Sequence, residues 1–411
     1  EEELKPHYQT ALRMLGAAKN PKLFTADKDL ERLAKEMDIH DQFEPTDVAV
    51  FFGEEDVTVE DPYFKGDGPK RTGCNFCGGC MTGCRNNSKN TLDKNYLYLA
   101  QKKGATILAE KEVYNVHPLD GNDGSMGYRV HLKSSTKLLK KRTTITTKGV
   151  IYSGGVLGTV KLLLSIRKKS LPLLSDQLGK DIRTNNETLV SVSKLDRKEN
   201  VAKGVAIGSI LHADENTHLE VVRYSESSGF WKLFHLPYAT GSNVFLRIAK
   251  MIWSLIKSPV SYFKIYVLNK WSKSTVVLLF MQTIDSKLRF RKNLLGKMTT
   301  SVASGKKPSP FIPESIKLSR AYARIAKGKE TSFALETLAG IPSTAHVLGG
   351  AVMGSDTAKG VIDKDNNVFN YKNMLVIDGS MISANPGVNP SLSITAIAER
   401  AMAQISDKPA A

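Results

Sequence analysis

The sequence predicts an α/β fold, and two segments carry that prediction. We expect residues 142–153 to form a strand that runs through Ser153-Gly154-Gly155 into an apolar helix over 160–166, a strand, tight glycine turn and helix in succession. Near the carboxyl end, a short apolar strand over 374–378 is followed by a loop and by a helix that opens at Asn389-Pro390-Ser391. Strands that feed helices in this way are typical of α/β proteins.

Helical and alternating patterns predict the remaining elements. Leucines and tyrosines recur at helical spacing in three stretches, and apolar residues alternate or run together in others. The predicted helices cover 4–15, 28–37 and 91–103; the predicted strands cover 105–116, 127–133 and 276–284, with more strands within 184–240; 41–73 and 301–313 are expected to be irregular.

Composition places the chain among globular proteins. Of 411 residues, 41% are hydrophobic and 24% charged, which excludes general disorder, a collagen-like repeat and a disulfide-stapled mini-protein. There are 58 Lys and Arg against 41 Asp and Glu, and the net charge of +17 favours phospholipid headgroups, nucleic acid or an acidic partner. The basic runs 137–142 and 167–169 lie beside strands without an aromatic platform, so we expect solvated faces there and no nucleic-acid binding.

The first residues contain no initiator methionine, basic leader or apolar signal core, so no secretory signal is expected. No apolar run approaches the roughly 18 residues that a spanning helix needs. The clustered cysteines fit a reducing compartment. These features predict a cytoplasmic protein, with peripheral membrane contact as an added option.

All four cysteines lie in one cluster, Cys74-x2-Cys77-x2-Cys80-x3-Cys84. This spacing matches the bacterial iron–sulfur run, although Arg85 replaces the proline that usually follows it. The cluster could hold a 4Fe-4S centre or a zinc ion, or it could be a loop of small residues with reduced thiols. An iron–sulfur electron-transfer protein or dehydrogenase subunit is therefore one alternative function.

Residues 245–271 combine a basic stripe with an apolar body. Arg247, Lys250, Ser254 and Lys257 form the polar stripe of the predicted helix, and Trp253 belongs to its apolar remainder. The segment could be an interfacial helix that contacts a membrane, a lid over an apolar cavity, or a buried helix whose lysines reach solvent. The positive net charge favours contact with anionic lipid.

Two positions near the carboxyl end are candidates for chemistry. His346 follows Ser343-Thr344-Ala345 and precedes a glycine pair, where an imidazole could act as a general base or simply be structural. Asn389 and Pro390 suit the N-cap and first turn of a helix, whose amide groups could stabilise negative charge on a cofactor or substrate oxygen. An ordinary capped helix would have the same pattern.

The segments HVLGGAVMGSD (346–356) and VIDGSMISANPGVNPSLSI (376–394) resemble the C-terminal signature of the glucose–methanol–choline (GMC) oxidoreductases, most closely the cholesterol oxidase-like branch. Upstream, NNSKNTLDKNYL (86–97) and the strand–glycine turn–helix at 151–164 are similar to the same family. The resemblance covers most of the chain and is weakest over 225–340.

The resemblance implies a fold and an activity. It implies an FAD-binding domain built from 104–172 and 360–411, a substrate domain over 175–345 with a mixed or antiparallel sheet, and a connecting helical and loop region over 1–103. The implied reaction is FAD-dependent oxidation of the CH–OH group of a bulky, apolar, sterol-like alcohol. The electron acceptor, oxygen or a carrier, is left open.

The resemblance also implies roles for single residues. His346 would take the substrate hydroxyl proton, Asn389 would orient the substrate oxygen beside the flavin, and Glu220 would be a second acid/base that isomerises a steroid double bond. The residues implied to bind the cofactor are Val113 at the adenine, Gly154 and Gly155 at the turn, Asp378 and Gly379 at the ribityl–pyrophosphate end, and Asn389, Pro390 and Ser391 at the flavin.

The family's G-x-G-x-x-G pyrophosphate motif does not occur in the sequence. We therefore expect the amino-terminal FAD-binding portion that carries this motif to be missing from the chain. A second alternative function follows from this expectation, a non-catalytic fragment that keeps a lipid cavity without its cofactor.

Overall fold

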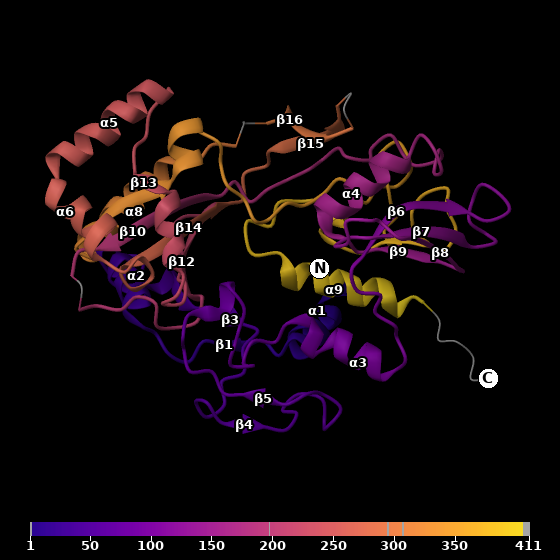
Figure 1. Cartoon of the computed structure of the whole chain (residues 1–411), viewed down its shortest axis with the longest axis horizontal. Helices are drawn as coiled ribbons and strands as arrows, with labels where there is room; N and C mark the ends of the chain where they lie inside the picture. The colour runs from indigo at the N-terminus through magenta and orange to yellow at the C-terminus, as the bar shows by residue number, and fades with distance from the viewer. Residues whose placement is uncertain (1, 197, 294–295, 306–307, 406–411) are drawn as a thin grey trace.

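The computed structural model describes residues 2–196, 198–293, 296–305 and 308–405. It confirms the predicted α/β class and has two lobes that lie side by side (Figure 1). One lobe is built on a seven-stranded sheet, and the other holds a three-stranded sheet, a parallel strand pair and helix α4.

The seven-stranded sheet is antiparallel throughout, and its strand β2 comes from outside the range 175–345. Its strand order is β13-β17-β10-β14-β12-β11-β2. Every residue of the neighbouring strands β12 and β14 is buried, so the sheet is covered on both faces. The strands are β13 (His235–Pro237), β17 (Gly328–Phe333), β10 (Thr188–Lys194), β14 (Thr275–Gln282), β12 (Thr217–Val222), β11 (Ile207–His212) and β2 (Phe43–Pro45).

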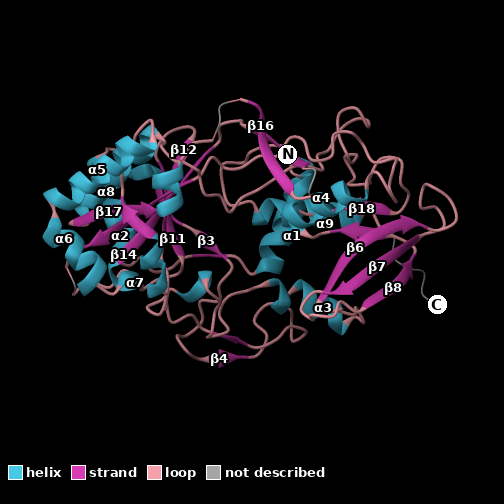
Figure 2. Ribbon diagram, turned by 45° about the horizontal axis from the view of Figure 1, so that its top comes forward, coloured by secondary structure: helices cyan, strands magenta, loops and turns pink. Residues whose placement is uncertain are grey.

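Helices α2 (Thr25–Glu36) and α8 (Pro313–Ile325) cover one face of this sheet (Figure 2). Leu30, Leu33 and Tyr322 pack from the helices against Leu219 and Phe280 of the strands. The sequence patterns did not predict α8 or β17. Helix α8 carries buried serines on the side that meets the sheet, and these weaken the apolar stripe that identifies a helix.

Two buried ion pairs fix α2 to the sheet. Asp27 lies 2.6 Å from Arg223, and both side chains are fully buried. Asp29 lies 2.7 Å from Lys194, which also contacts Glu199. Removing one partner of such a pair would leave an uncompensated buried charge.

The second lobe holds the strand–turn–helix that the sequence predicts. Strands β6 (Lys111–Pro118), β7 (Tyr128–Ser134) and β8 (Arg142–Thr147) form an antiparallel sheet. Strand β9 (Val150–Tyr152) pairs in parallel with β18 (Met374–Val376), and helix α4 (Gly155–Ile166) follows it.

The single strand predicted over 142–153 is wrong, because β8 and β9 belong to different sheets. The chain bends between them at Lys148 and Gly149. A side chain at Gly149 would lie 2.9 Å from the carbonyl oxygen of Asn373, so glycine is what allows the chain to pass this close.

The amino-terminal helices pack on the last helix. Helix α1 (Lys5–Leu15) contacts α9 (Ser391–Ala403) through Tyr8, whose hydroxyl donates to Ser393 at 2.7 Å. The predicted helix over 91–103 is instead a 3-10 turn followed by α3 (Tyr96–Lys102), which reaches α9 through the hydrogen bond from Tyr96 to Glu399.

The expected irregular stretch 41–73 contains β2 and the short strands β3 (Asp47–Val48), β4 (Thr58–Val59) and β5 (Arg71–Thr72). Strand β3 pairs with β1 (Ala18–Lys19).

A hairpin and a helical segment complete the fold. Strands β15 (Lys287–Lys292) and β16 (Met298–Ser304) form a hairpin that spans the gap between the lobes (Figure 1). The loop predicted from residue 301 therefore starts later, and its residues 306–307 lie outside the described residues. Helices α5 (Val244–Lys257) and α6 (Pro259–Phe263) lie at the outer end of the sheet lobe (Figure 1), and the buried turn α7 (Trp271–Ser274) leads into β14. Within the described ranges, no helix has the length and apolar character to cross a membrane.

The buried ion pairs make a testable prediction for stability. Asp27→Asn leaves Arg223 unpaired in the core, and we expect it to lower the free energy of unfolding by about 3–5 kcal/mol in urea titrations. Arg324→Ala breaks the exposed ion pair with Glu36 and should cost no more than about 1 kcal/mol. Equal losses in the two variants would contradict the role given to the buried pair.

Candidate active site

The carboxyl ends of β9 and β18 meet at one edge of the second lobe. Gly154 and Gly155 form the turn after β9, and Asp378 follows β18. The Thr159 hydroxyl donates to Asp378 Oδ2 at 2.5 Å, and the Gly154 amide donates to the Thr159 hydroxyl at 3.1 Å. Asp378 thus ties both strand ends together. Ligands of α/β proteins bind beyond the carboxyl ends of parallel strands, so this edge is a candidate position for a ligand.

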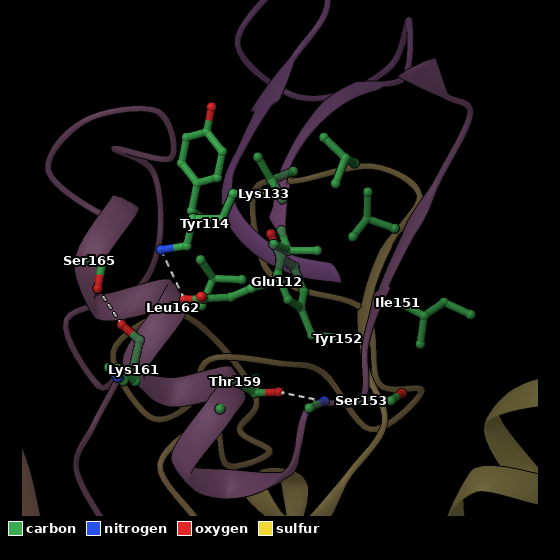
Figure 3. A pocket seen from close by; sticks show the side chains of 16 residues that line it. Glu112, Tyr114, Lys133, Ile151, Tyr152, Ser153, Thr159, Lys161, Leu162 and Ser165 are labelled. Atoms are coloured by element: carbon green, nitrogen blue, oxygen red, sulfur yellow. Dashed lines mark hydrogen bonds and ion pairs between the residues drawn. The ribbon is translucent and has the colours of Figure 1, made fainter. Parts of the chain in front are cut away.

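A cavity of about 510 Å³ opens beside this turn (Figure 3). Val113 from β6 and Gly154 both line it, together with Ile151, Tyr152 and Leu162. The structure therefore brings together two residues, 41 positions apart in the chain, that were predicted to contact the cofactor. Gly155 has a φ of +69°, and a side chain there would meet open space.

The loop before α9 is held by carboxamides. Asn185 donates to the carbonyl of Val388 at 2.8 Å, and Asn385 donates to the carbonyl of Gln282 at 2.8 Å. Gly387 has a φ of +64°, and a side chain there would lie 2.3 Å from Thr283 Cγ2, so the turn requires glycine. These contacts fasten the loop to the end of β14.

The prediction that Asn389 caps the last helix is wrong. Helix α9 begins at Ser391 with Pro390 at its N-cap, and no side chain caps it. The carboxamide of Asn389 donates instead to Glu220 Oε1 at 2.8 Å, because the buried carboxyl group offers an acceptor that the helix end does not. The first-turn amides of α9 are left without a side-chain acceptor and can face an anionic group. Gly379 packs against Val156 and Ile394, which brings the starts of α4 and α9 together.

Glu220 lies on β12 and is 2% exposed. Burial raises its pKa to about 7, although the hydrogen bond from Asn389 and the nearby His346 act in the opposite direction. Its Oε2 atom is buried and has no hydrogen-bond partner within the described structure. A carboxyl group in this state can both give and take a proton near neutral pH.

His346 lies opposite a second buried carboxylate. Its Nδ1 is 3.0 Å from Oε1 of Glu187, which precedes β10. Burial favours a raised pKa at Glu187, but contacts with His346, Thr344 and the Ala345 amide prevail and lower it. The sequence reasoning missed Glu187, because no spacing or motif links it to a histidine 159 positions later.

The Asn389–Glu220 pair and the His346–Glu187 pair form one cluster. Both His346 and Glu187 act electrostatically on the buried carboxyl group of Glu220. His218, two residues before Glu220 on β12, is also buried and close to His346; burial lowers its pKa to about 4. The structure thus brings His346, Asn389 and Glu220 to one place, and His218 is a neighbour that no sequence pattern predicted.

A second cavity, of about 600 Å³, opens beside this cluster. Thr344 and Val347, on either side of His346, lie in its wall. Most of its lining is apolar and comes from α4, the segment before β10, the β15–β16 hairpin and the loop before His346: Leu157, Ile182, Leu288, Phe290, Met298, Val302, Ile341 and Pro342. Its size is that of a small-molecule site, and its lining suits a bulky apolar ligand.

The cysteine cluster does not match the predicted metal site. Cys74, Cys77, Cys80 and Cys84 are free and line a cavity of about 10 Å³. Burial raises the pKa of Cys74 to about 11. Across the part of the chain that the structure describes, no group of three or more histidine, cysteine or acidic residues is arranged to hold a metal ion. The 4Fe-4S or zinc site therefore has no matching ligand geometry there.

Comparisons with known proteins identify similar chains. Two family profiles described as GMC oxidoreductase match residues 31–171 and 308–398. A cholesterol oxidase of Acinetobacter baumannii is 42% identical over 99% of this chain and 75% of its own length. A cholesterol oxidase of Mycobacterium tuberculosis is 39% identical over 97% of this chain and 71% of its own length. The crystal structure of a pyridoxine 4-oxidase from Mesorbium loti superposes with a TM-score of 0.53 at 12% identity, covering 94% of this chain and 71% of that one, and is similar in fold alone.

The raised pKa of Glu220 predicts a pH-dependent effect on stability. The folded chain holds this proton up to pH of about 7, whereas an unfolded chain loses it near 4.5, so stability falls as the pH rises through this window. Glu220→Gln should therefore be as stable as the parent below pH 4.5 and more stable above pH 7, by about 3 kcal/mol, in urea titrations.

Glu226→Gln is the matched control. A hydrogen bond from Lys273 lowers the pKa of Glu226, so this variant should lose stability at neutral pH and match the parent only in acid. If the difference in the free energy of unfolding between Glu220→Gln and the parent does not change with pH, the raised pKa of the buried Glu220 carboxyl group is contradicted.

Proposed function

The chain belongs to the GMC oxidoreductase family, whose members oxidise alcohols with FAD, and we propose that its substrate is a bulky apolar alcohol of the sterol type. The observation that carries this proposal is the apolar cavity of about 600 Å³ beside His346. The two cholesterol oxidases, 42% and 39% identical to this chain, support the same substrate class.

The residues present fit FAD. Val113 and Gly154 line the cavity of about 510 Å³, the position beside Gly155 is open, and the first-turn amides of α9 have no side-chain cap. In this proposal Val113 would hold the adenine end, Gly154, Gly155, Asp378 and Gly379 would hold the middle of the cofactor, and Asn389, Pro390 and Ser391 would lie at the flavin. When bound, FAD supplies the acceptor for the hydride that leaves the alcohol carbon.

The protein's own groups handle the proton and the orientation. Oxidation of CH–OH to C=O releases one hydride and one proton, and His346 takes the hydroxyl proton. Asn389 orients the substrate oxygen while its carboxamide stays bonded to Glu220. Glu220, with a pKa of about 7, can then move a proton between carbons of a sterol-like product and shift its double bond. The apolar lining limits the access of water.

The family assignment favours neither alternative function. An iron–sulfur electron-transfer protein would need a cluster site, and a non-catalytic lipid-binding fragment would need no acid/base groups beside the cavity. The buried Glu220 and the paired His346 are costly to keep in an apolar site, and catalysis accounts for them.

His346→Ala tests the proposed base. We expect the turnover number with cholesterol to fall by about 10²–10⁴-fold while the visible flavin absorbance of the purified protein is retained. His40→Ala, at an exposed histidine on the sheet lobe, should leave turnover unchanged. Unchanged turnover in His346→Ala would refute the assigned role.

We also propose that α5 and α6 contact an anionic membrane. Only part of the polar stripe of α5 faces inward: Arg247 is buried and donates to the carbonyl groups of Gly241, Thr337 and Leu338, whereas Lys250 and Lys257 are exposed. The apolar side is left outside, with Phe245 80% and Trp253 64% exposed. This arrangement is the reverse of a soluble amphipathic helix and suits a helix whose outer face lies in lipid.

The distribution of charged residues also supports membrane contact by α5 and α6. Residues 227–284 contain seven basic and no acidic side chains. Lys250 and Lys257 are exposed on α5 beside its apolar face. Anionic headgroups would attract such a surface and could deliver an apolar alcohol that dissolves in the bilayer.

Reversing two of these charges tests the membrane contact. Lys250→Glu with Lys257→Glu should lower binding to vesicles of phosphatidylcholine and phosphatidylserine by about tenfold or more in sedimentation assays, since each lysine near an anionic surface contributes about 1 kcal/mol. Lys168→Glu with Lys169→Glu reverses the same number of charges on the other lobe and should have a smaller effect. Equal effects of the two pairs would argue against a specific surface.

A further inference from the structure

We propose that Glu187 is a positioning residue that fixes the tautomer and orientation of His346, so that Nε2 of the imidazole accepts the substrate proton. The inference rests on the proposed function, because it assigns a partner to the base of that reaction. Glu187 was not among the residues that the sequence or the family resemblance singled out.

The contacts of Glu187 converge on the loop that carries His346. Oε1 lies 3.0 Å from His346 Nδ1 and accepts the His346 amide at 3.2 Å. Oε2 accepts the Ala345 amide at 3.0 Å, and the Thr344 hydroxyl also donates to Oε1. One carboxylate therefore accepts hydrogen bonds from three consecutive residues, Thr344, Ala345 and His346, and lies beside the imidazole of His346. Its side chain is 2% exposed, so water does not compete for these contacts.

The position of Glu187 favours one ring nitrogen as the site of the proton. Nδ1 lies 3.0 Å from Glu187 Oε1 without the geometry of a hydrogen bond and has no other hydrogen-bond partner in the described structure. An ionised carboxylate only accepts hydrogen bonds, so its negative charge beside Nδ1 favours a hydrogen on that nitrogen. With Nδ1 protonated, Nε2 has a free lone pair and is the basic atom. A carboxylate that orients a histidine in this way also stabilises the imidazolium that forms when the base accepts a proton.

The surroundings of Glu187 and Glu220 favour different protonation states for the two carboxyl groups. Hydrogen bonds lower the pKa of Glu187, whereas burial, with Glu187 adding to it, raises the pKa of Glu220 to about 7. His218 faces the same cluster and is held neutral by burial. The charge opposite His346 therefore belongs to Glu187, and Glu220 is free for a separate proton transfer.

Nitrogen-15 NMR of histidine-labelled full-length chain tests this directly, with the His346 signals assigned by their loss in His346→Gln. We expect Nδ1 to be protonated in neutral His346 of the parent protein, and the Nε2-protonated form to gain population in Glu187→Gln. A neutral His346 that carries its proton on Nε2 in the parent overturns the proposal, even if the variant fails to fold.

Kinetics give a second readout on the flavin-containing protein. Glu187→Gln should lower the turnover number for cholesterol at least tenfold, as expected for a misoriented base, with little change in KM. Glu336→Gln is the matched control, because Glu336 is a buried carboxyl group that accepts the Ser343 amide of the same loop at 3.2 Å. It should alter neither turnover nor the His346 tautomer.

The kinetic and NMR results test the positioning role of Glu187 separately from the proposed sterol substrate. Equal losses of turnover in the Glu187 and Glu336 variants, with an unchanged tautomer in both, would overturn the positioning role and leave only loop stability. A parent protein that oxidises no sterol would overturn the proposed substrate, whereas the NMR result would still support or refute the link between Glu187 and His346.

Discussion

The hydrogen bond from Asn389 to Glu220 joins the two lobes at the place where the chemistry is proposed. Asn389 ends the loop that leads into α9, and Glu220 lies on a fully buried strand of the seven-stranded sheet. A buried carboxyl group without a partner is costly, so this contact stabilises both sides of the junction. The position of His346 depends on the same junction, because its loop is held by Glu187, which precedes β10 of the same seven-stranded sheet.

The two cavities share the first turn of α4 as a wall. Leu157 faces the apolar cavity, and Gly154 and Thr159 face the cavity beside the strand ends. The same helical turn therefore lines both cavities, and in the proposed function an alcohol and a cofactor would lie next to each other there, as hydride transfer requires. The β15–β16 hairpin contributes Phe290 and Met298 to the apolar cavity.

Local patterns in the sequence predicted the strand–turn–helix at β9 and α4, the last strand and helix, and buried β14, because each has a strong apolar period. They failed where tertiary contacts decide the outcome. Asn389 has the chemistry of a helix cap but bonds to Glu220, and Arg247 of the polar stripe of α5 is buried against the protein. Glu187 and His218 carry no local signal, since only the folded sheet brings them to His346.

The most direct test of the central claim is the anaerobic mixing of the flavin-containing chain with cholesterol, followed by visible absorbance. If His346, Asn389 and Glu220 form one site beside the cofactor, the flavin absorbance of the parent protein should bleach in a single turnover. A flavin spectrum that stays oxidised with cholesterol present would contradict a shared site for alcohol and cofactor.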